Sequence, residues 1–228
     1  MKPQSIFLIR HGESAGNVDK TVYHTIPDWQ VPLTDKGQLQ ALEAGKKLHN
    51  LLRMEDYWVK SALSGKPHRK LVQIYTSPWY RARQTTANIL LGMDLYQENI
   101  KEDPRIREQE WGNYQEIHLQ NKIKKERRQY GSFFFRMPHG ESGADVYDRV
   151  TGFIGTLYRD FAKEDFPTYA IISTHGLTIK VFLMRWFKWS IEDFEKYDTP
   201  DNCAIVQMDL QDNGKYKLMT ELKLYPNS

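Results

Sequence analysis

Two histidines in the sequence share one local pattern, in which each follows an apolar run and precedes a glycine. His11 comes after residues 6–9, and His175 comes after residues 169–174, with Arg10 directly before the first histidine. A neutral imidazole can act as a nucleophile or as a proton carrier, and a guanidinium binds anionic oxygens in pairs. A cation beside an imidazole therefore indicates an anionic substrate, with phosphate as the first candidate.

Buried strands are expected to carry these side chains to one edge of a sheet. Residues 6–9, 71–76 and 169–174 are short apolar runs, which predict strands covered on both faces. Arg81 falls in the first turn of the helix expected after residues 71–76. Ligands of open α/β sheets bind at the carboxyl ends of the strands, so two arginines and two histidines should converge on one pocket.

The other periodic segments predict an α/β fold: a doubly wound, mostly parallel sheet with helices on both faces. The apolar stripe over residues 146–161 is typical of a helix that covers a sheet, and residues 177–187 predict another helix. Residues 204–210 and 216–225 predict a closing pair of strands around a turn that contains glycine.

Three stretches depart from this pattern without dividing the chain. Residues 14–32 are rich in turn-forming types and are expected to be a loop at the mouth of the first strand. Residues 53–70 form a charged insertion with no assigned function. Residues 105–140 include a possible helix at 116–130, and a long excursion of this kind is expected to cover a pocket. Residues 1–228 are therefore expected to form a single domain with a lid over the active site.

Composition excludes several classes of protein. Lys plus Arg is 32 and Asp plus Glu is 29, so the net charge of +3 is too small to indicate a nucleic-acid partner. A single cysteine, Cys203, excludes an intrachain disulfide and favours an intracellular setting. Because the chain has no signal-like start and no apolar run long enough to span a bilayer, we expect a cytoplasmic protein without a membrane partner. The expected partner is a small phosphorylated substrate, and the sequence does not determine the oligomeric state.

An ordered set of motifs resembles the histidine phosphatase superfamily, whose fold is the phosphoglycerate-mutase-like one. The set runs from about Ser5 to Asn202 and comprises Arg10-His11-Gly12-Glu13 with Asn17, Leu33-Thr34 to Gly37, Ser77-Pro78 with Arg81-Ala82 and Thr85, Ile106 to Glu108 with Gly112, Gly140-Glu141-Ser142, and Ser173-Thr174-His175-Gly176. Arg-His-Gly alone is a weak signal, whereas the ordered set is specific. Residues 105–114 and 131–142 are similar to fungal broad-range acid phosphatases and plant phosphoglycerate-mutase-like proteins.

The resemblance implies a histidine acid phosphatase-type phosphomonoesterase that works through a phosphohistidine. His11 would be the nucleophile, and Glu108 would protonate the leaving group before it deprotonates water. The remaining implied residues are His175 in the catalytic set and Arg10, Asn17, Arg81 and Gly176 on the phosphate. A carboxylic acid donates a proton only when part of its population is protonated, so we expect an acidic pH optimum. No cofactor is expected, and because the other histidines, at 24, 49, 68, 118 and 139, have no metal-ligand spacing among themselves, no metal is expected either.

Each assignment has a structural alternative. Either histidine could be a core residue at a strand end, and Asn17 could be an ordinary turn residue. Arg81 could be solvated at its helix start. Without the family pattern, Glu110 and Glu102 compete with Glu108 for the role of acid.

Two features bear on the substrate. Arg127, Arg128 or Arg136 could reach over the pocket to a second anionic group, although a basic run such as 122–128 could equally be a solvated helix face. Trp111 and the phenylalanines at 133–135 could line a hydrophobic wall, or they could pack beneath the excursion.

Two other functions remain possible. A phosphoglycerate-mutase-type phosphotransferase would use the same chemistry and return the phosphoryl group to a second hydroxyl. A noncatalytic module that binds phosphate or phosphoproteins would need only the arginines. The residues around Glu108, namely Gln109, Glu110 and Trp111, depart from the mutase pattern, which favours hydrolysis.

Overall fold

A six-stranded sheet forms the centre of the protein. The computed structural model describes residues 2–64, 71–95, 100–112 and 117–225. The strands lie in the order β3-β2-β4-β1-β5-β6. Their bounds are β1 Ser5–Arg10, β2 Val72–Thr76, β3 Ile100–Glu102, β4 Tyr169–Thr174, β5 Ile205–Leu210 and β6 Tyr216–Leu218. The first four are parallel to one another, and β5 and β6 run antiparallel at one edge.

The strand register places the two His-Gly turns side by side. Arg10 of β1 pairs with Thr174 of the parallel neighbour β4. The next residue on each strand is a histidine, so His11 and His175 leave the sheet together at its carboxyl edge. This arrangement follows from parallel pairing, which aligns equivalent ends of strands that are far apart in sequence.

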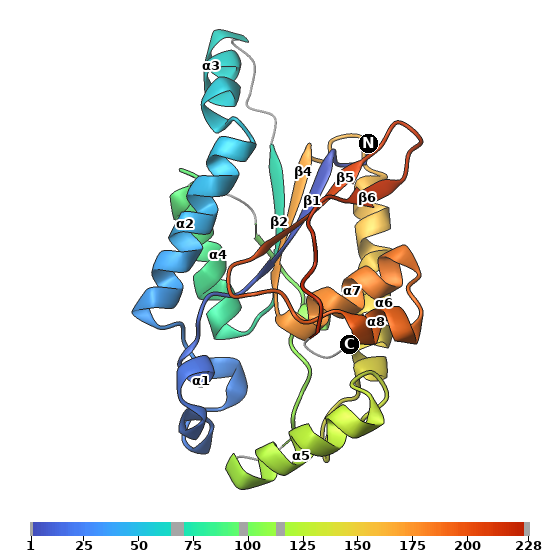
Figure 1. The fold of residues 1–228 in the computed structure, drawn as a ribbon. Helices are drawn as coiled ribbons and strands as arrows, with labels where there is room; N and C mark the ends of the chain where they lie inside the picture. The colour runs from blue at the N-terminus through green and yellow to red at the C-terminus, as the bar shows by residue number, and fades with distance from the viewer. Residues whose placement is uncertain (1, 65–70, 96–99, 113–116, 226–228) are drawn as a thin grey trace.

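Two pairs of helices cover the two faces of the sheet. Helices α2 (Asp35–Leu51) and α4 (Tyr80–Gly92) lie on one face, and α6 (Gly143–Phe161) and α7 (Gly176–Phe187) lie on the other (Figure 1). Side chains alternate along β1, so Ile6 and Leu8 join the core on the α6 and α7 side. Phe7 and Ile9 join the core on the α2 and α4 side. An apolar strand buried on both faces is what a doubly wound sheet requires.

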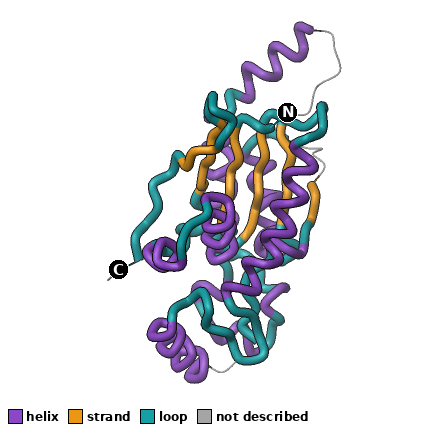
Figure 2. Tube along the Cα trace, turned by 90° about the vertical axis from the view of Figure 1, so that its right-hand side faces the viewer, coloured by secondary structure: helices purple, strands orange, loops and turns teal. Residues whose placement is uncertain are grey.

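Several further helical segments lie beyond the carboxyl ends of the parallel strands. The chain leaving β1 forms α1 (Ala15–Val18) and the 3-10 turns η1 (Lys20–His24) and η2 (Asp28–Gln30). Helix α5 (Ile117–Tyr130) lies at the same end of the molecule, as both views show (Figures 1 and 2). The other elements are α3 (Met54–Ser64), η3 (Pro104–Ile106) and α8 (Ile191–Lys196).

The structure confirms the predicted fold class and adds three details. The expected loop at 14–32 contains α1, η1 and η2, because short helical turns need no long apolar period. The insertion at 53–70 begins with α3, and its residues 65–70 lie outside the described residues. Residues 113 and 114, which belong to the stretch 105–114 of the family resemblance, also lie outside them. The edge strand β3 was not predicted, since three residues are too few to show alternation. Among the described residues, no helix is both long and apolar enough to cross a membrane.

Candidate active site

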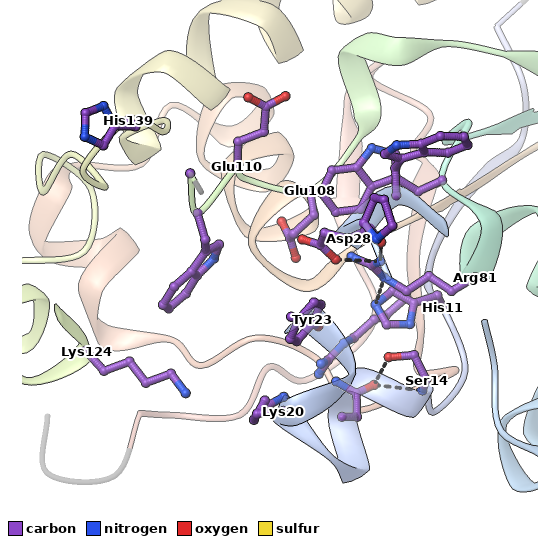
Figure 3. Close-up of a pocket in the computed structure, with 17 residues that line it drawn as sticks. His11, Ser14, Lys20, Tyr23, Asp28, Arg81, Glu108, Glu110, Lys124 and His139 are labelled. Carbon is purple, nitrogen blue, oxygen red and sulfur yellow. Dashed lines mark hydrogen bonds and ion pairs between the residues drawn. The ribbon is translucent and has the colours of Figure 1, made fainter. Parts of the chain in front are cut away.

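A cavity of about 560 Å³ opens at the carboxyl edge of the sheet. Its walls come from the turn after β1, the segment 14–29, the start of α4, the segment after η3 and helix α5. The residues that line it are Arg10, His11, Ser14, Asn17, Lys20, Tyr23, Pro27, Asp28, Trp29, Trp79, Arg81, Glu108, Glu110, Trp111, Gly112, Lys124 and His139 (Figure 3). The volume is typical of a site for a small organic ligand.

The hydrogen bonds of His11 determine which of its ring nitrogens carries the hydrogen and which carries the lone pair. Nδ1 lies 2.7 Å from the carbonyl oxygen of Gly12, and a carbonyl can only accept, so Nδ1 carries the hydrogen. Nε2 accepts a hydrogen bond from Nε of Arg81 at 3.3 Å. Burial, followed by the charges of Arg81 and Arg10, holds the pKa of His11 well below 6.5. The imidazole is therefore neutral, and its nucleophilic nitrogen is Nε2.

Close backbone contact fixes the turn that presents His11. The amide of Gly12 donates to the hydroxyl of Thr85 on α4 at 3.0 Å. A side chain at Gly12 would collide with the carbonyl of Gly37 in the first turn of α2. Thr34 caps that helix by accepting from the amide of Gly37 at 3.0 Å. The glycine pair thus lets the helix start pack directly on the histidine turn.

The two arginines reach the cavity from different elements. Arg81 is only 4% exposed, and its Nη1 donates to the carbonyl and the Oδ1 of Asp28 at 2.7 and 2.9 Å. Its guanidinium also lies 4.5 Å from the ring centre of Trp79. Arg10 donates from Nη1 to the carbonyl of Pro200 at 2.7 Å, and its buried Nε has no partner among the described residues. Both cations stand next to His11, where an anion would satisfy them.

His175 lies directly behind His11 and is fully buried. The ring centres are 5.1 Å apart, and Nε2 of His175 lies 2.8 Å from the hydroxyl of Ser77. Its Nδ1 has no hydrogen-bond partner within the described part of the chain. Burial and the charge of Arg81 lower its pKa well below 6.5, so this ring is neutral as well. Gly176 begins α7 close to Nε of Arg10 and does not line the cavity.

Glu108 is held at the amino terminus of α7. Its Oε1 accepts from the amide of Gln109 at 3.0 Å and from the hydroxyl of Thr178 at 3.3 Å, and Oε2 accepts from the amide of Leu177 at 3.2 Å. Arg149 supports the same segment by donating to the Glu108 carbonyl at 3.0 Å. The carboxylate lines the cavity (Figure 3), and a carboxyl group is able to exchange a proton with a ligand.

The competing carboxylates have other partners. Glu102 forms an ion pair with Arg83 at 3.0 Å, and it does not line the cavity. Glu110 lines the cavity but forms an ion pair with Arg107 at 3.0 Å.

Asn17 lines the cavity and is bonded through its amide oxygen. Its Oδ1 accepts from the amide of Ser14 at 3.0 Å, from the Ser14 hydroxyl at 3.1 Å and from Nδ2 of Asn202 at 3.3 Å. Among the described residues, the hydrogen bonds given for the Asn17 side chain all use the oxygen, whereas its amide nitrogen is a donor.

The three arginines expected to determine specificity do not line the cavity. Arg127 donates to Gln109 at 3.1 Å and lies 5.6 Å from the Trp111 ring centre. Arg128 donates to the hydroxyl of Tyr225 at 2.9 Å, and Arg136 forms an ion pair with Asp145 at 2.7 Å. The aromatic residues of this region have different environments. Trp111 lines the cavity, Phe133 packs in the core and Phe134 is exposed.

Several cavity residues were not predicted as site residues, chiefly Lys20, Tyr23, Asp28 and Lys124. The first three belong to the segment 14–32, which was expected only to lie at the mouth of the first strand. Lys124 belongs to the basic run of α5, where periodicity cannot distinguish the cation that faces the cavity from its neighbours.

Comparison with known proteins identifies the family of this chain. The family model of the histidine phosphatase superfamily (branch 1) matches residues 6–221. The phosphoglycerate mutase-like protein AT74 of Arabidopsis thaliana is 42% identical over 225 residues, which cover 95% of this chain and 68% of that protein. The broad-range acid phosphatase DET1 of Saccharomyces cerevisiae is 33% identical, with coverage of 97% and 90%.

Solved structures show the same fold at low sequence identity. A mycobacterial glucosyl-3-phosphoglycerate phosphatase solved with VO3 has a TM-score of 0.68 at 19% identity, covering 96% of this chain and 99% of that one. A phosphoglycerate mutase from Bacillus anthracis has a TM-score of 0.68 at 16% identity, covering 95% and 92%. The sequence matches and the shared fold lead to one conclusion: this chain belongs to the histidine phosphatase superfamily, branch 1.

Proposed function

We propose that this protein is a phosphomonoesterase that hydrolyses phosphate esters through a phosphohistidine at Nε2 of His11. The observation that carries the proposal is the state of this nitrogen. The bond from Nδ1 to Gly12 leaves the lone pair on Nε2, and the lowered pKa of His11 favours the neutral ring. A buried neutral imidazole beside two arginines is suited to attack phosphorus.

In the first step, the Nε2 lone pair forms the bond to phosphorus, and the bond from phosphorus to the alcohol oxygen breaks. Glu108 gives its proton to that oxygen, so the alcohol leaves neutral. Arg10 and Arg81 face the phosphoryl oxygens, where charge gathers in the transition state. The amide of Asn17 supplies a further donor.

In the second step, Glu108 removes a proton from water as the water oxygen attacks the phosphohistidine. The bond between phosphorus and Nε2 breaks, inorganic phosphate leaves, and Glu108 is again protonated. His175 has no direct place in this cycle. In the proposal, His175 packs against His11 as a neutral ring, so it adds no third positive charge next to the nucleophile.

The name of the yeast relative supports hydrolysis. The more similar AT74 is named only as phosphoglycerate mutase-like, and relatives less similar than DET1 are named mutases. A 2,3-bisphosphoglycerate-dependent phosphoglycerate mutase of Gloeobacter violaceus is 26% identical over 218 residues. We place hydrolysis first because DET1, which is more similar than this mutase, is named a phosphatase.

The test compares a chromogenic aryl phosphate with monophosphoglycerate plus bisphosphoglycerate. We expect inorganic phosphate from the aryl ester, and a loss of at least about 1,000-fold in His11→Ala, because the nucleophile is removed. His24→Ala is the matched control, since His24 is exposed and does not line the cavity. Isomerisation without phosphate release would instead identify a mutase, and inactivity on both substrates would identify a noncatalytic phosphate-binding module.

Trapping the intermediate tests the covalent step directly. Rapid acid quenching during turnover should reveal acid-labile phosphate on the wild-type chain and none on His11→Ala. Turnover without labelled protein in the wild type would contradict the phosphohistidine.

A further inference from the structure

Two lysines, Lys20 of η1 and Lys124 of α5, line the cavity away from the histidine pair. Figure 3 shows Lys124 on the far side of the cavity from His11, with Lys20 between them. The two residues are far apart in sequence, and the fold brings both to the lining of one cavity.

The carboxylates that line the cavity already have hydrogen-bond or ion-pair partners other than the lysines. Asp28 accepts from Arg81, Glu110 pairs with Arg107, and Glu108 accepts the bonds at the start of α7. None of them forms an ion pair with either lysine.

The lysines also lack anionic partners of their own. Lys20 donates to the carbonyl of Gly16, and Lys124 lies 5.9 Å from the ring centre of Trp111. Neither makes a salt bridge within the described residues. By contrast, Lys122 on the same helix faces Glu126 at 3.9 Å.

This pair of cations has an electrostatic cost. Burial lowers the pKa of Lys20, and the charge of Lys124 lowers it further, whereas Asp28 opposes the shift. Like charges that line the same cavity repel, and a bound anion would relieve that repulsion.

The cavity has room for such an anion besides the phosphate at His11. At about 560 Å³ it is much larger than one phosphate group, and the aromatic residues Tyr23 and Trp111 also line it. We propose that Lys20 and Lys124 bind a second anionic group, carboxylate or phosphate, on the alcohol portion of the substrate. The substrate class is then a small phosphomonoester with a second anionic group. This proposal rests on the proposed function for the identity of the first group.

The test uses three esters on one scaffold: phenyl phosphate, 4-carboxyphenyl phosphate and benzene-1,4-diyl bisphosphate. Their affinities are measured by calorimetry with His11→Ala, which binds without turnover. We expect the two doubly anionic ligands to bind at least about 10-fold more tightly than phenyl phosphate, with an advantage that shrinks as salt rises. A preference for the carboxylate or for the bisphosphate would identify the second group.

The lysine variants are made in the same background. Lys20→Met and Lys124→Met should each remove most of the advantage of the doubly anionic ligands, and the double variant should abolish it. Lys122→Met is the matched control on α5 and should preserve the ratio. Equal affinities for the three ligands, or an unchanged ratio in the double variant, would overturn the subsite. Failure of the wild type to hydrolyse any of the esters would overturn the phosphomonoesterase proposal without altering this binding result.

Discussion

Arg81 donates its Nε hydrogen to the same nitrogen of His11 that attacks phosphorus in the proposed mechanism, at 3.3 Å. The contact gives Arg81 two effects on one atom. Its charge helps to keep the imidazole neutral, and its guanidinium stands where phosphoryl oxygens would lie beside Nε2. The resting site therefore holds the nucleophile and a phosphate-binding donor in direct contact before any substrate arrives.

Arg81→Lys should lower kcat/KM for an aryl phosphate by about 100-fold, because an ammonium cannot replace a planar guanidinium that donates to His11 and Asp28 together. Steady-state kinetics measure the effect. The control is Arg83→Lys on the same helix, whose side chain is exposed and pairs with Glu102. If both variants lose activity equally, the position of the guanidinium does not matter.

Asp28→Asn tests a carboxylate that competes with phosphate for Arg81. Burial raises the pKa of Asp28, but above that pKa the group is ionised and repels a phosphate dianion. The amide keeps an oxygen acceptor for Arg81 without the charge, so KM should fall by about 3- to 10-fold at neutral pH.

The pH dependence of the Asp28→Asn effect follows from the direction of the shift. As pH falls through the raised pKa, the wild-type carboxyl becomes neutral, so the two KM values should converge in acid. A higher KM for Asp28→Asn at every pH would show that Asp28 chiefly positions Arg81. KM measured across the pH range for both proteins distinguishes these outcomes.

Glu108→Gln should lower kcat by about 100- to 10,000-fold, the usual contribution of a general acid or base. The deficit should be largest for alkyl phosphates, whose poor leaving groups need the proton, and smallest for nitrophenyl phosphate. Glu110→Gln is the control, since Glu110 lines the same cavity but pairs with Arg107. A deficit that does not vary with the leaving group would exclude Glu108 as the proton donor.

The sequence predicted the strands that present the site better than it predicted the site's walls. Buried parallel strands produce apolar runs, so the positions of His11 and His175 at one edge follow from residues 6–9 and 169–174 together with parallel pairing. The walls come from short helical turns and from α5, where no period shows which side chains face inward. Lys124 and Arg127 are three residues apart on that helix. Lys124 lines the cavity, whereas Arg127 does not and donates a hydrogen bond to Gln109.

Lys180 provides the last prediction, which concerns stability. It is 6% exposed, and its ammonium lies 4.1 Å from the ring centre of Phe194. Burial lowers its pKa to about 8, with Glu195 and Asp198 opposing the shift and Arg127 adding to it. In the unfolded chain the pKa is 10.5, so between these values the unfolded state binds a proton that the native state lacks. The contribution of Lys180 to the free energy of unfolding should therefore rise with pH across this window, by up to about 1.4 kcal/mol per pH unit.

Lys180→Met should remove this rise and raise the free energy of unfolding at pH 7 by about 1 to 3 kcal/mol, because the buried charge is replaced by an apolar group of similar length. Urea unfolding at several pH values measures both effects. Lys217→Met on the exposed side of β6 is the control and should keep the wild-type pH dependence. If Lys180→Met is less stable than the wild type at pH 7 and Lys217→Met is not, the Lys180 ammonium has a stabilising anionic partner, with Glu195 and Asp198 the nearest candidates by charge.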